Sequence, residues 1–112
     1  MAETAGMFDP ALMDPTRFGI VSLLAATRWA EFSYVRDSLG LSDSALSKQA
    51  SHLSKAGYLE VHKGYVGKRP RTWLRLSPAG RNALAGHIRY LQEVARTARE
   101  LGQSHEPESP PG

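Results

Sequence analysis

The 112-residue sequence contains no cysteine. Disulfide scaffolds, thiolate zinc sites, iron–sulfur clusters and cysteine nucleophiles are therefore excluded. Small secreted domains commonly depend on disulfides, so this absence favours a reducing compartment, and we expect the protein in the cytoplasm. Long apolar runs are also missing. The longest uncharged stretch covers residues 18–27, well short of the ~20 apolar residues that span a bilayer. No basic residue precedes Arg17, so we expect neither a membrane segment nor a signal peptide.

Motifs of catalysis and metal binding are likewise missing. The sequence has no phosphate-binding glycine loop, no recognisable Ser/His/Asp set and no carboxylate pair in an apolar setting, so no enzyme activity and no cofactor is expected. The histidines are never spaced at i, i+3 or i, i+4, the spacing that would place two on one helical face. No metal site is expected from these four residues: His52, His62, His87 and His105.

Acidic residues are scarce in the middle of the chain. Residues 44–89 carry nine basic side chains and one acidic side chain, Glu60, a net charge of +8. The segments before and after it carry net charges of −3 and −2. A basic stripe of this size predicts a polyanionic partner. The alternative is a basic face that is merely solvated.

Cap residues followed by proline or by apolar periodicity mark the helices. Ser33 is expected to cap the second main helix, and Ser42 to cap the third, which Gly57 ends. The predicted helical segments are 10–13, 15–27, 34–39, 43–56 and 78–101. After Gly57 the apolar period changes to two, which predicts two strands joined by the basic connection 64–70. We expect that connection to be longer than a two-residue turn and to protrude.

The last predicted helix carries two adjacent apolar stripes, whereas a helix on one globular surface needs one. We therefore expect it to pack on its own domain and on a second subunit, with a helix sunk into a single domain as the alternative. The preferred stripe ends in small residues that permit close helix approach, although the sequence leaves open which stripe faces the partner. With two N-terminal apolar residues, the expected dimer interface is Phe8, Leu12, Leu84, Ile88, Leu91, Ala95 and Ala98.

Two helices joined by a tight turn and followed by a basic hairpin form the order of a winged helix-turn-helix. We therefore predict a mainly α fold with a small β-hairpin and a long C-terminal dimerisation helix, over residues 8–101. Residues 1–7 and 102–112 are expected to be disordered. Most aromatic residues, including Trp29, Phe32, Tyr34, Tyr58 and Tyr90, are expected to fill the core, while the role of Trp73 is open.

The run LSDSALSKQASHLSKAGYLEVHKGYVGKRPRTWLRLSPAGR resembles the winged helix-turn-helix of bacterial transcriptional regulators of the MarR and ArsR type. The resemblance is greatest to a small subgroup that combines a GKRPRTW wing with an LSPAGR helix start. It implies a homodimeric DNA-binding regulator, with 43–56 as the recognition helix and 68–71 as the wing. The chain is too short for the extra helices of larger drug-sensing relatives, so an effector remains unknown.

The expected partner is duplex DNA with a palindromic operator, bound by a repressor that acts by occlusion. The recognition-helix candidates are Ser44, Ala45, Ser47, Lys48, Gln49, Ser51, His52 and Lys55. Five of them are expected at or near base edges: Ser44, Ser47, Lys48, Gln49 and His52. Phosphate contacts are expected from Lys55, Lys63, Arg71 and Arg75, and minor-groove contact from Arg69 together with Lys68. The alternatives are a winged helix that binds only proteins and, less favoured, an RNA-binding domain.

Overall fold

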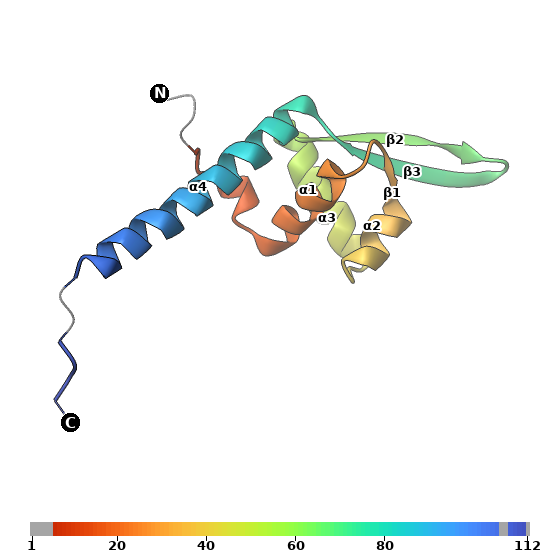
Figure 1. Ribbon diagram of the computed structural model, residues 1–112. Coiled ribbons are helices and arrows are strands. Elements are labelled where there is room, and N and C mark those ends of the chain that lie inside the picture. The colour runs from red at the N-terminus through yellow and green to blue at the C-terminus, as the bar shows by residue number, and fades with distance from the viewer. Residues whose placement is uncertain (1–5, 106–107, 112) are drawn as a thin grey trace.

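A computed structural model describes residues 6–105 and 108–111, and its elements follow the order of a winged helix (Figure 1). Four helices and three strands account for most of it. The helices are α1 (Pro15–Ala25), α2 (Phe32–Ser38), α3 (Asp43–Lys55) and α4 (Pro78–Gln103), preceded by the 3₁₀ turn η2 (Pro10–Leu12). The strands are β1 (Ala30–Glu31), β2 (Leu59–Val66) and β3 (Arg69–Leu76). The predicted fold class is confirmed. No helix in these described ranges is long and apolar enough to cross a membrane.

Side-chain caps start most of the helices where the sequence predicted. Asp14 accepts from the Arg17 amide, Ser42 from the Ala45 amide, and Ser77 from the Gly80 amide. Ser33, however, is not a cap, and that prediction is wrong. Helix α2 begins at Phe32 with Glu31 in the cap position and no side-chain hydrogen bond there. The cause is β1, which runs directly into the helix and leaves no capping residue between them.

The strands form one antiparallel sheet in the order β1-β3-β2. Strand β1 was not predicted, because two residues are too short to display a period of two. The connection between β2 and β3 also differs from the prediction. It is a two-residue turn, Gly67-Lys68, since Val66 already pairs with Arg69. Gly67 has a φ of 64°, and a positive φ at the first central position is what a type II′ hairpin turn requires. Pairing therefore extends across Pro70, which lies inside the predicted connection 64–70.

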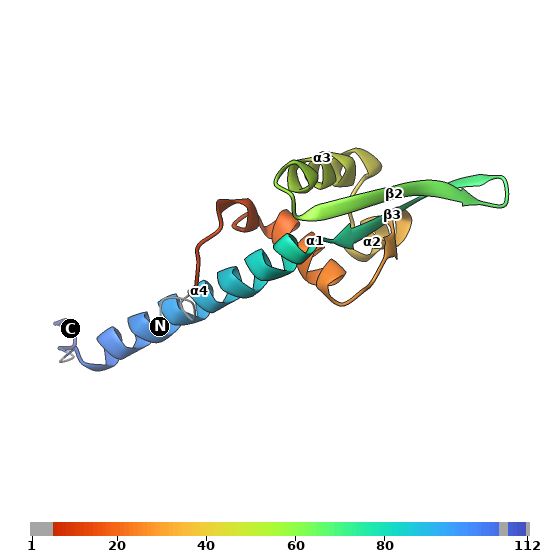
Figure 2. The same ribbon diagram turned by 90° about the horizontal axis from the view of Figure 1, so that it is seen from above.

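The hydrophobic core lies between α1, α3, the base of the sheet and the first half of α4. Its buried side chains are mostly leucines from these four elements. The largest fully buried ones include Leu12, Ile20, Leu24, Leu46, Leu53, Leu74 and Leu76. Gly80 lets the start of α4 approach the sheet, because a Cβ there would lie 2.4 Å from the Tyr58 carbonyl oxygen. This core fixes α3 beside the hairpin, as Figure 2 shows.

The segment before α1 runs from α4 to the end of α3. The Met7 amide donates to the Gly86 carbonyl at 2.9 Å, and the Asp9 amide donates to Nδ1 of the buried His87 at 3.1 Å. The Tyr58 hydroxyl donates to the Asp9 carboxylate at 2.5 Å. This hydrogen bond, with some burial, raises the pKa of Tyr58 to about 12. Three distant parts of the chain are thereby joined at Asp9.

The second half of α4 extends away from the other helices (Figure 1), and the helix ends at Gln103, two residues beyond its predicted end. The predicted disorder of residues 1–7 and 102–112 falls partly outside the described residues, which omit 1–5, 106–107 and 112. Within them, Gly6 and Met7 hydrogen-bond to α4, and Gly102 and Gln103 are helical.

Candidate nucleic-acid interface

Helix α3 turns one face into the core and leaves the other open. Leu46, Ala50 and Leu53 are buried. Six of the eight predicted recognition-helix residues are exposed on the opposite side: Ser44, Ser47, Lys48, Ser51, His52 and Lys55. Neither lysine has an ion-pair partner within residues 6–105 and 108–111. The outer face of α3 is therefore basic and rich in hydroxyl groups.

Two predicted residues of α3 lie elsewhere. Ala45 is half-buried. Gln49 is also half-buried, and its side-chain oxygen accepts a hydrogen bond from Nη1 of Arg17 at 3.1 Å. Nε of Arg17 donates in turn to the Ala11 carbonyl at 2.6 Å. The carboxamide oxygen of Gln49 thus links α3 to α1, so only its NH2 group stays available for the predicted base contact.

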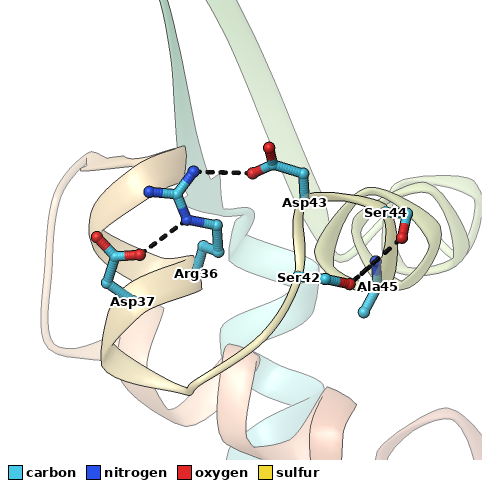
Figure 3. A network of polar contacts seen from close by, with 6 residues as sticks. All are labelled: Arg36, Asp37, Ser42, Asp43, Ser44 and Ala45. Carbon is cyan, nitrogen blue, oxygen red and sulfur yellow. Dashed lines mark hydrogen bonds and ion pairs between the residues drawn. The ribbon is translucent and has the colours of Figure 1, made fainter.

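An arginine on α2 neutralises the single acid of α3. Figure 3 shows Arg36 between Asp37 and Asp43, with 2.8 Å from Nε to Asp37 and 2.8 Å from Nη1 to Asp43. The hydrogen bond from Arg36 lowers the pKa of Asp37 below its usual value. The Ser42 hydroxyl caps α3 and lies 3.3 Å from the Ser44 hydroxyl. The start of α3 therefore presents hydroxyls, while its carboxylate is occupied by Arg36.

The wing, by which we mean β2, β3 and their turn, has two faces that carry different cations. Residues paired across the two strands share a face, and faces alternate along each strand. The register pairs Lys63 with Thr72 on the face toward α3, and places Arg69, Arg71 and Arg75 on the other face. Lys68 lies in the turn.

The arginines on the outer face are largely engaged within the chain. Arg75 forms a close ion pair with Glu60, and its guanidinium carbon lies 4.5 Å from the Trp29 ring centroid. Nε of Arg71 lies 3.6 Å from the Glu31 carboxylate. Arg75, and to a smaller extent Arg71, is therefore less available to phosphate than an unpaired cation. Lys63, Lys68 and Arg69 form no ion pair inside the part of the chain that the structure describes.

A groove of about 810 Å³ separates α3 from the inner face of the wing. One wall contributes Lys55 and the other Lys63. Between them the lining contains four hydroxyl residues, Ser47, Ser51, Ser54 and Thr72, above an apolar floor of Phe32, Ala50, Val61 and Leu74. Asp43 also lines the groove, but Arg36 holds its carboxylate. Such a surface suits an anion that accepts hydrogen bonds.

The predicted dimer residues divide into two groups. Leu12 and Leu84 are buried in the chain's own core, at 1% and 7% exposure, and are not available to a partner. Their assignment to an interface is therefore corrected. The remaining residues stay exposed along α4 and the N-terminal segment: Phe8, Ile88, Leu91, Ala95 and Ala98. The other apolar stripe of α4 consists of Ala83, His87, Tyr90, Val94, Thr97 and Leu101. In it, His87 is buried, while Val94 and Leu101 are exposed.

Sequence reasoning missed an aromatic cluster on the outer face of the wing. Trp29 is 40% exposed, so its assignment to the core is wrong, as is that of Tyr34 at 54%. The half-buried Trp73 and Trp29 both pack against His62. The matching parity of His62 and Trp73 in their strands could have indicated a shared face. Among the described residues, no group of three or more His, Cys, Asp or Glu side chains could hold a metal ion.

Comparisons with known proteins agree with this geometry. Residues 16–95 match the family described as "Winged helix DNA-binding domain". An uncharacterized protein of Methanocaldococcus jannaschii, MJ0432, is 26% identical over 80 residues, which are 71% of this chain and 87% of the relative.

Two solved structures illustrate the similarity of fold. A transcriptional regulator homologue from Pyrococcus horikoshii superimposes with a TM-score of 0.73 at 26% identity, over 79% of this chain and 87% of that one. A zinc-responsive MarR family member, ZitR of Lactococcus lactis, gives 0.56 at 20% identity, over 82% of this chain and 62% of the longer regulator. The fold is thus shared with MarR-family transcriptional regulators. From the family match over most of its length, the chain belongs to the winged helix DNA-binding domain family.

Proposed function

We propose that the protein is a sequence-specific DNA-binding transcriptional regulator. The observation that carries the proposal is the outer face of α3, which exposes hydroxyls, His52 and two lysines, while its single acid is held by Arg36. A helix that merely faces solvent would gain from acidic side chains paired with its lysines. A helix that enters the ~12 Å major groove gains from having no unpaired acidic side chain, because such a side chain would repel the phosphates.

In this proposal the first half of α3 enters the major groove. Ser44, Ser47 and Lys48 are exposed there, and His52 follows one turn after Lys48 on the same face; these four residues supply the base-edge contacts. Gln49 has a supporting role, because its carboxamide oxygen fixes α3 against α1. Substituting Gln49 would thus alter the position of the helix, whereas substituting Lys48 would remove a contact.

The groove between α3 and the wing is proposed to hold one sugar–phosphate strand. Lys55 and Lys63 stand on its two walls, and its hydroxyls can donate to phosphate oxygens. Lys68 and Arg69 lie at the tip of the hairpin and are proposed to enter the adjacent minor groove. This assignment uses the wing and α3 cations that have no ion-pair partner among residues 6–105 and 108–111.

We further propose that two chains bind a palindromic operator as a homodimer and repress transcription by occlusion in the cytoplasm. A single winged helix contacts few base pairs, whereas two copies about 34 Å apart reach successive major-groove faces. The exposed apolar residues on the projecting half of α4 supply a surface for pairing: Ile88, Leu91, Val94 and Leu101.

The test is selection of genomic fragments by the purified protein, followed by sequencing of what is retained. We expect an inverted repeat whose half-sites are one helical turn apart. Lys48→Ala should relax the preference at particular base pairs, at a cost of about 1–3 kcal/mol. Arg89→Ala, at an exposed position of α4 on the side away from the apolar stripes, is the matched control and should change nothing. Retention of no common sequence would instead favour a protein-interaction module.

A further inference from the structure

Residues 6–13, here called the strap, lie across α4 where that helix leaves the core (Figure 2). The Met7 amide donates to the Gly86 carbonyl at 2.9 Å, and the Asp9 amide donates to Nδ1 of His87 at 3.1 Å. His87 is 1% exposed, so water does not compete for its Nδ1. The exposed apolar residues that are proposed to pair two chains follow directly on α4. The strap is thus attached where the core-packed half of α4 meets its projecting half.

The strap is also tied to α3, at two places. The Tyr58 hydroxyl, just beyond the end of α3, donates to Oδ2 of Asp9 at 2.5 Å. Arg17 makes the second link, because Nε donates to the Ala11 carbonyl at 2.6 Å and Nη1 donates to the Gln49 side chain at 3.1 Å. The strap therefore holds both the middle and the end of the proposed recognition helix.

Asp9 is the residue at which these two sets of contacts meet. Its backbone amide binds α4 through His87, and its Oδ2 binds Tyr58 at the end of α3. Its Oδ1 accepts from the Ala11 amide at 3.0 Å, which fixes the carboxylate in this orientation. Over the described residues, α3 packs chiefly against β2 and α1, whereas α4 packs chiefly against α1 and β3. Asp9 thus joins two helices that otherwise meet mainly through other elements.

We propose that Asp9 is a positioning residue that fixes α3 relative to α4 and thereby sets the distance between the recognition helices of two subunits. This inference rests on the proposed homodimer and DNA-binding function. Because α4 pairs the chains and α3 enters the DNA, freedom between these helices changes the separation of the two copies of α3. Half-sites one helical turn apart require a separation of about 34 Å. One additional base pair moves a half-site by only ~3.4 Å, so a loose strap would blur the preference for spacing.

The separation can be measured on DNA-free protein, because the chain contains no cysteine that would take up a label elsewhere. Ser51→Cys, at an exposed position of α3, gives one attachment site for a nitroxide in each chain. Pulsed dipolar electron paramagnetic resonance then reports the distance between the two labels of a dimer. We expect a narrow distribution near the ~34 Å that separates successive major-groove faces. Asp9→Ala and Tyr58→Phe, which break the same hydrogen bond from its two ends, should each broaden this distribution roughly twofold.

Two further variants separate positioning from loss of an acid. Asp9→Asn should keep the narrow distribution, because the carboxamide oxygen can accept from the Ala11 amide while its NH2 group donates to the Tyr58 oxygen. Glu60→Ala removes a carboxylate that is paired with Arg75 on the wing, and it should change nothing. The proposal is overturned if Asp9→Ala stays as narrow as the wild type, if Glu60→Ala broadens the distribution equally, or if the wild type gives no dipolar signal.

A binding experiment with the unlabelled proteins relates the label distances to DNA. The selected operator is compared with versions in which one base pair is added between the half-sites or removed. The wild type should prefer the selected spacing roughly tenfold, because twisting the DNA back into register costs energy, and Asp9→Ala should lose most of this preference. Equal discrimination by both proteins would show that Asp9 does not set the spacing. A wild type that selects no operator would contradict the proposed function instead, and the label distances would still decide the role of Asp9.

Discussion

The sequence alone predicts phosphate contacts for both Lys63 and Arg75, but the two residues lie on opposite faces of the wing and should affect DNA binding differently. Lys63 faces the groove beside α3, whereas Arg75 is paired with Glu60 on the other face. Lys63→Gln should remove a phosphate contact. Arg75→Gln should remove a positive charge that makes no phosphate contact. Because the Arg75–Glu60 pair is partly exposed, its loss should cost at most about 1 kcal/mol of stability and leave the fold intact.

The salt dependence of binding gives the magnitude. Five cations on α3 and the wing form no ion pair with the described residues: Lys48, Lys55, Lys63, Lys68 and Arg69. Cations in either groove displace counterions as backbone contacts do, so if about four of the five act in each subunit, a dimer neutralises about eight phosphates and the slope of log affinity against log salt is about −7. Affinity should then fall roughly 10⁴-fold between about 50 and 200 mM salt. Lys63→Gln removes one contact from each subunit, so the slope should become about −5.

Fluorescence anisotropy with a labelled operator at several salt concentrations measures these slopes. We expect the wild-type and Arg75→Gln slopes to coincide and the Lys63→Gln slope to be shallower. A shallower slope for Arg75→Gln, equal to that of Lys63→Gln, would show that the outer face contacts DNA. A wild-type affinity that barely changes with salt would refute the whole electrostatic assignment.

Three further predictions concern stability and assembly. Tyr58→Phe removes the hydrogen bond to Asp9 and should lower the free energy of unfolding by about 1 kcal/mol, measured in urea. Folding raises the Tyr58 pKa to about 12, so the stabilisation by this hydrogen bond should be intact below pH ~10 and disappear as the pH rises toward ~12. If Tyr58→Phe leaves the alkaline unfolding transition unchanged, the role of this hydrogen bond is contradicted. Gly80→Ala places a Cβ 2.4 Å from the Tyr58 carbonyl and should destabilise by about 1–3 kcal/mol, whereas Gly86→Ala, with ordinary contacts to Met7, should not; equal unfolding midpoints would refute the close approach. Leu91→Glu would bury an unpaired carboxylate in the proposed α4 interface, so sedimentation should show a folded monomer, while Ala85→Glu, at an exposed position off the stripe, should remain a dimer. A wild-type chain that is monomeric at tens of micromolar would refute the dimer itself.

Local signals predicted the fold well. Asp14, Ser42 and Ser77 each cap a helix because the hydrogen bond they make spans three residues of the same chain segment. The change of apolar period after Gly57 located the two long strands for a similar reason, since alternation is a property of one strand. The failure at Ser33 has a non-local cause. Strand β1 exists only because β3 pairs with it, and it displaces the start of α2.

The candidate site was predictable in outline but not in its pairings. The exposed positions of α3 follow from helical periodicity, which is why Lys48 and Lys55 are found where expected. The hydrogen bond of Gln49 depends on Arg17, which is 32 residues away. The burial of Leu12 and Leu84 depends on where the N-terminal segment packs against α4. No spacing along the sequence encodes these contacts, because they are set by how the elements pack.

The two-residue turn shows how one local geometry decides the electrostatics of the whole wing. Closing the hairpin at Gly67-Lys68 sets the register, and the register places Glu60 opposite Arg75. A connection one residue longer would shift the register by one position and move Glu60 away from the position opposite Arg75. The net charge of +8 in residues 44–89 already subtracts Glu60, yet it still overstates what DNA can meet, because Glu31 lies beside Arg71 and because Arg81 and Arg89 lie on α4. The cations without an acidic partner lie on α3, on the inner face of the wing and at its tip. Binding along a single sugar–phosphate strand requires this distribution of positive charge.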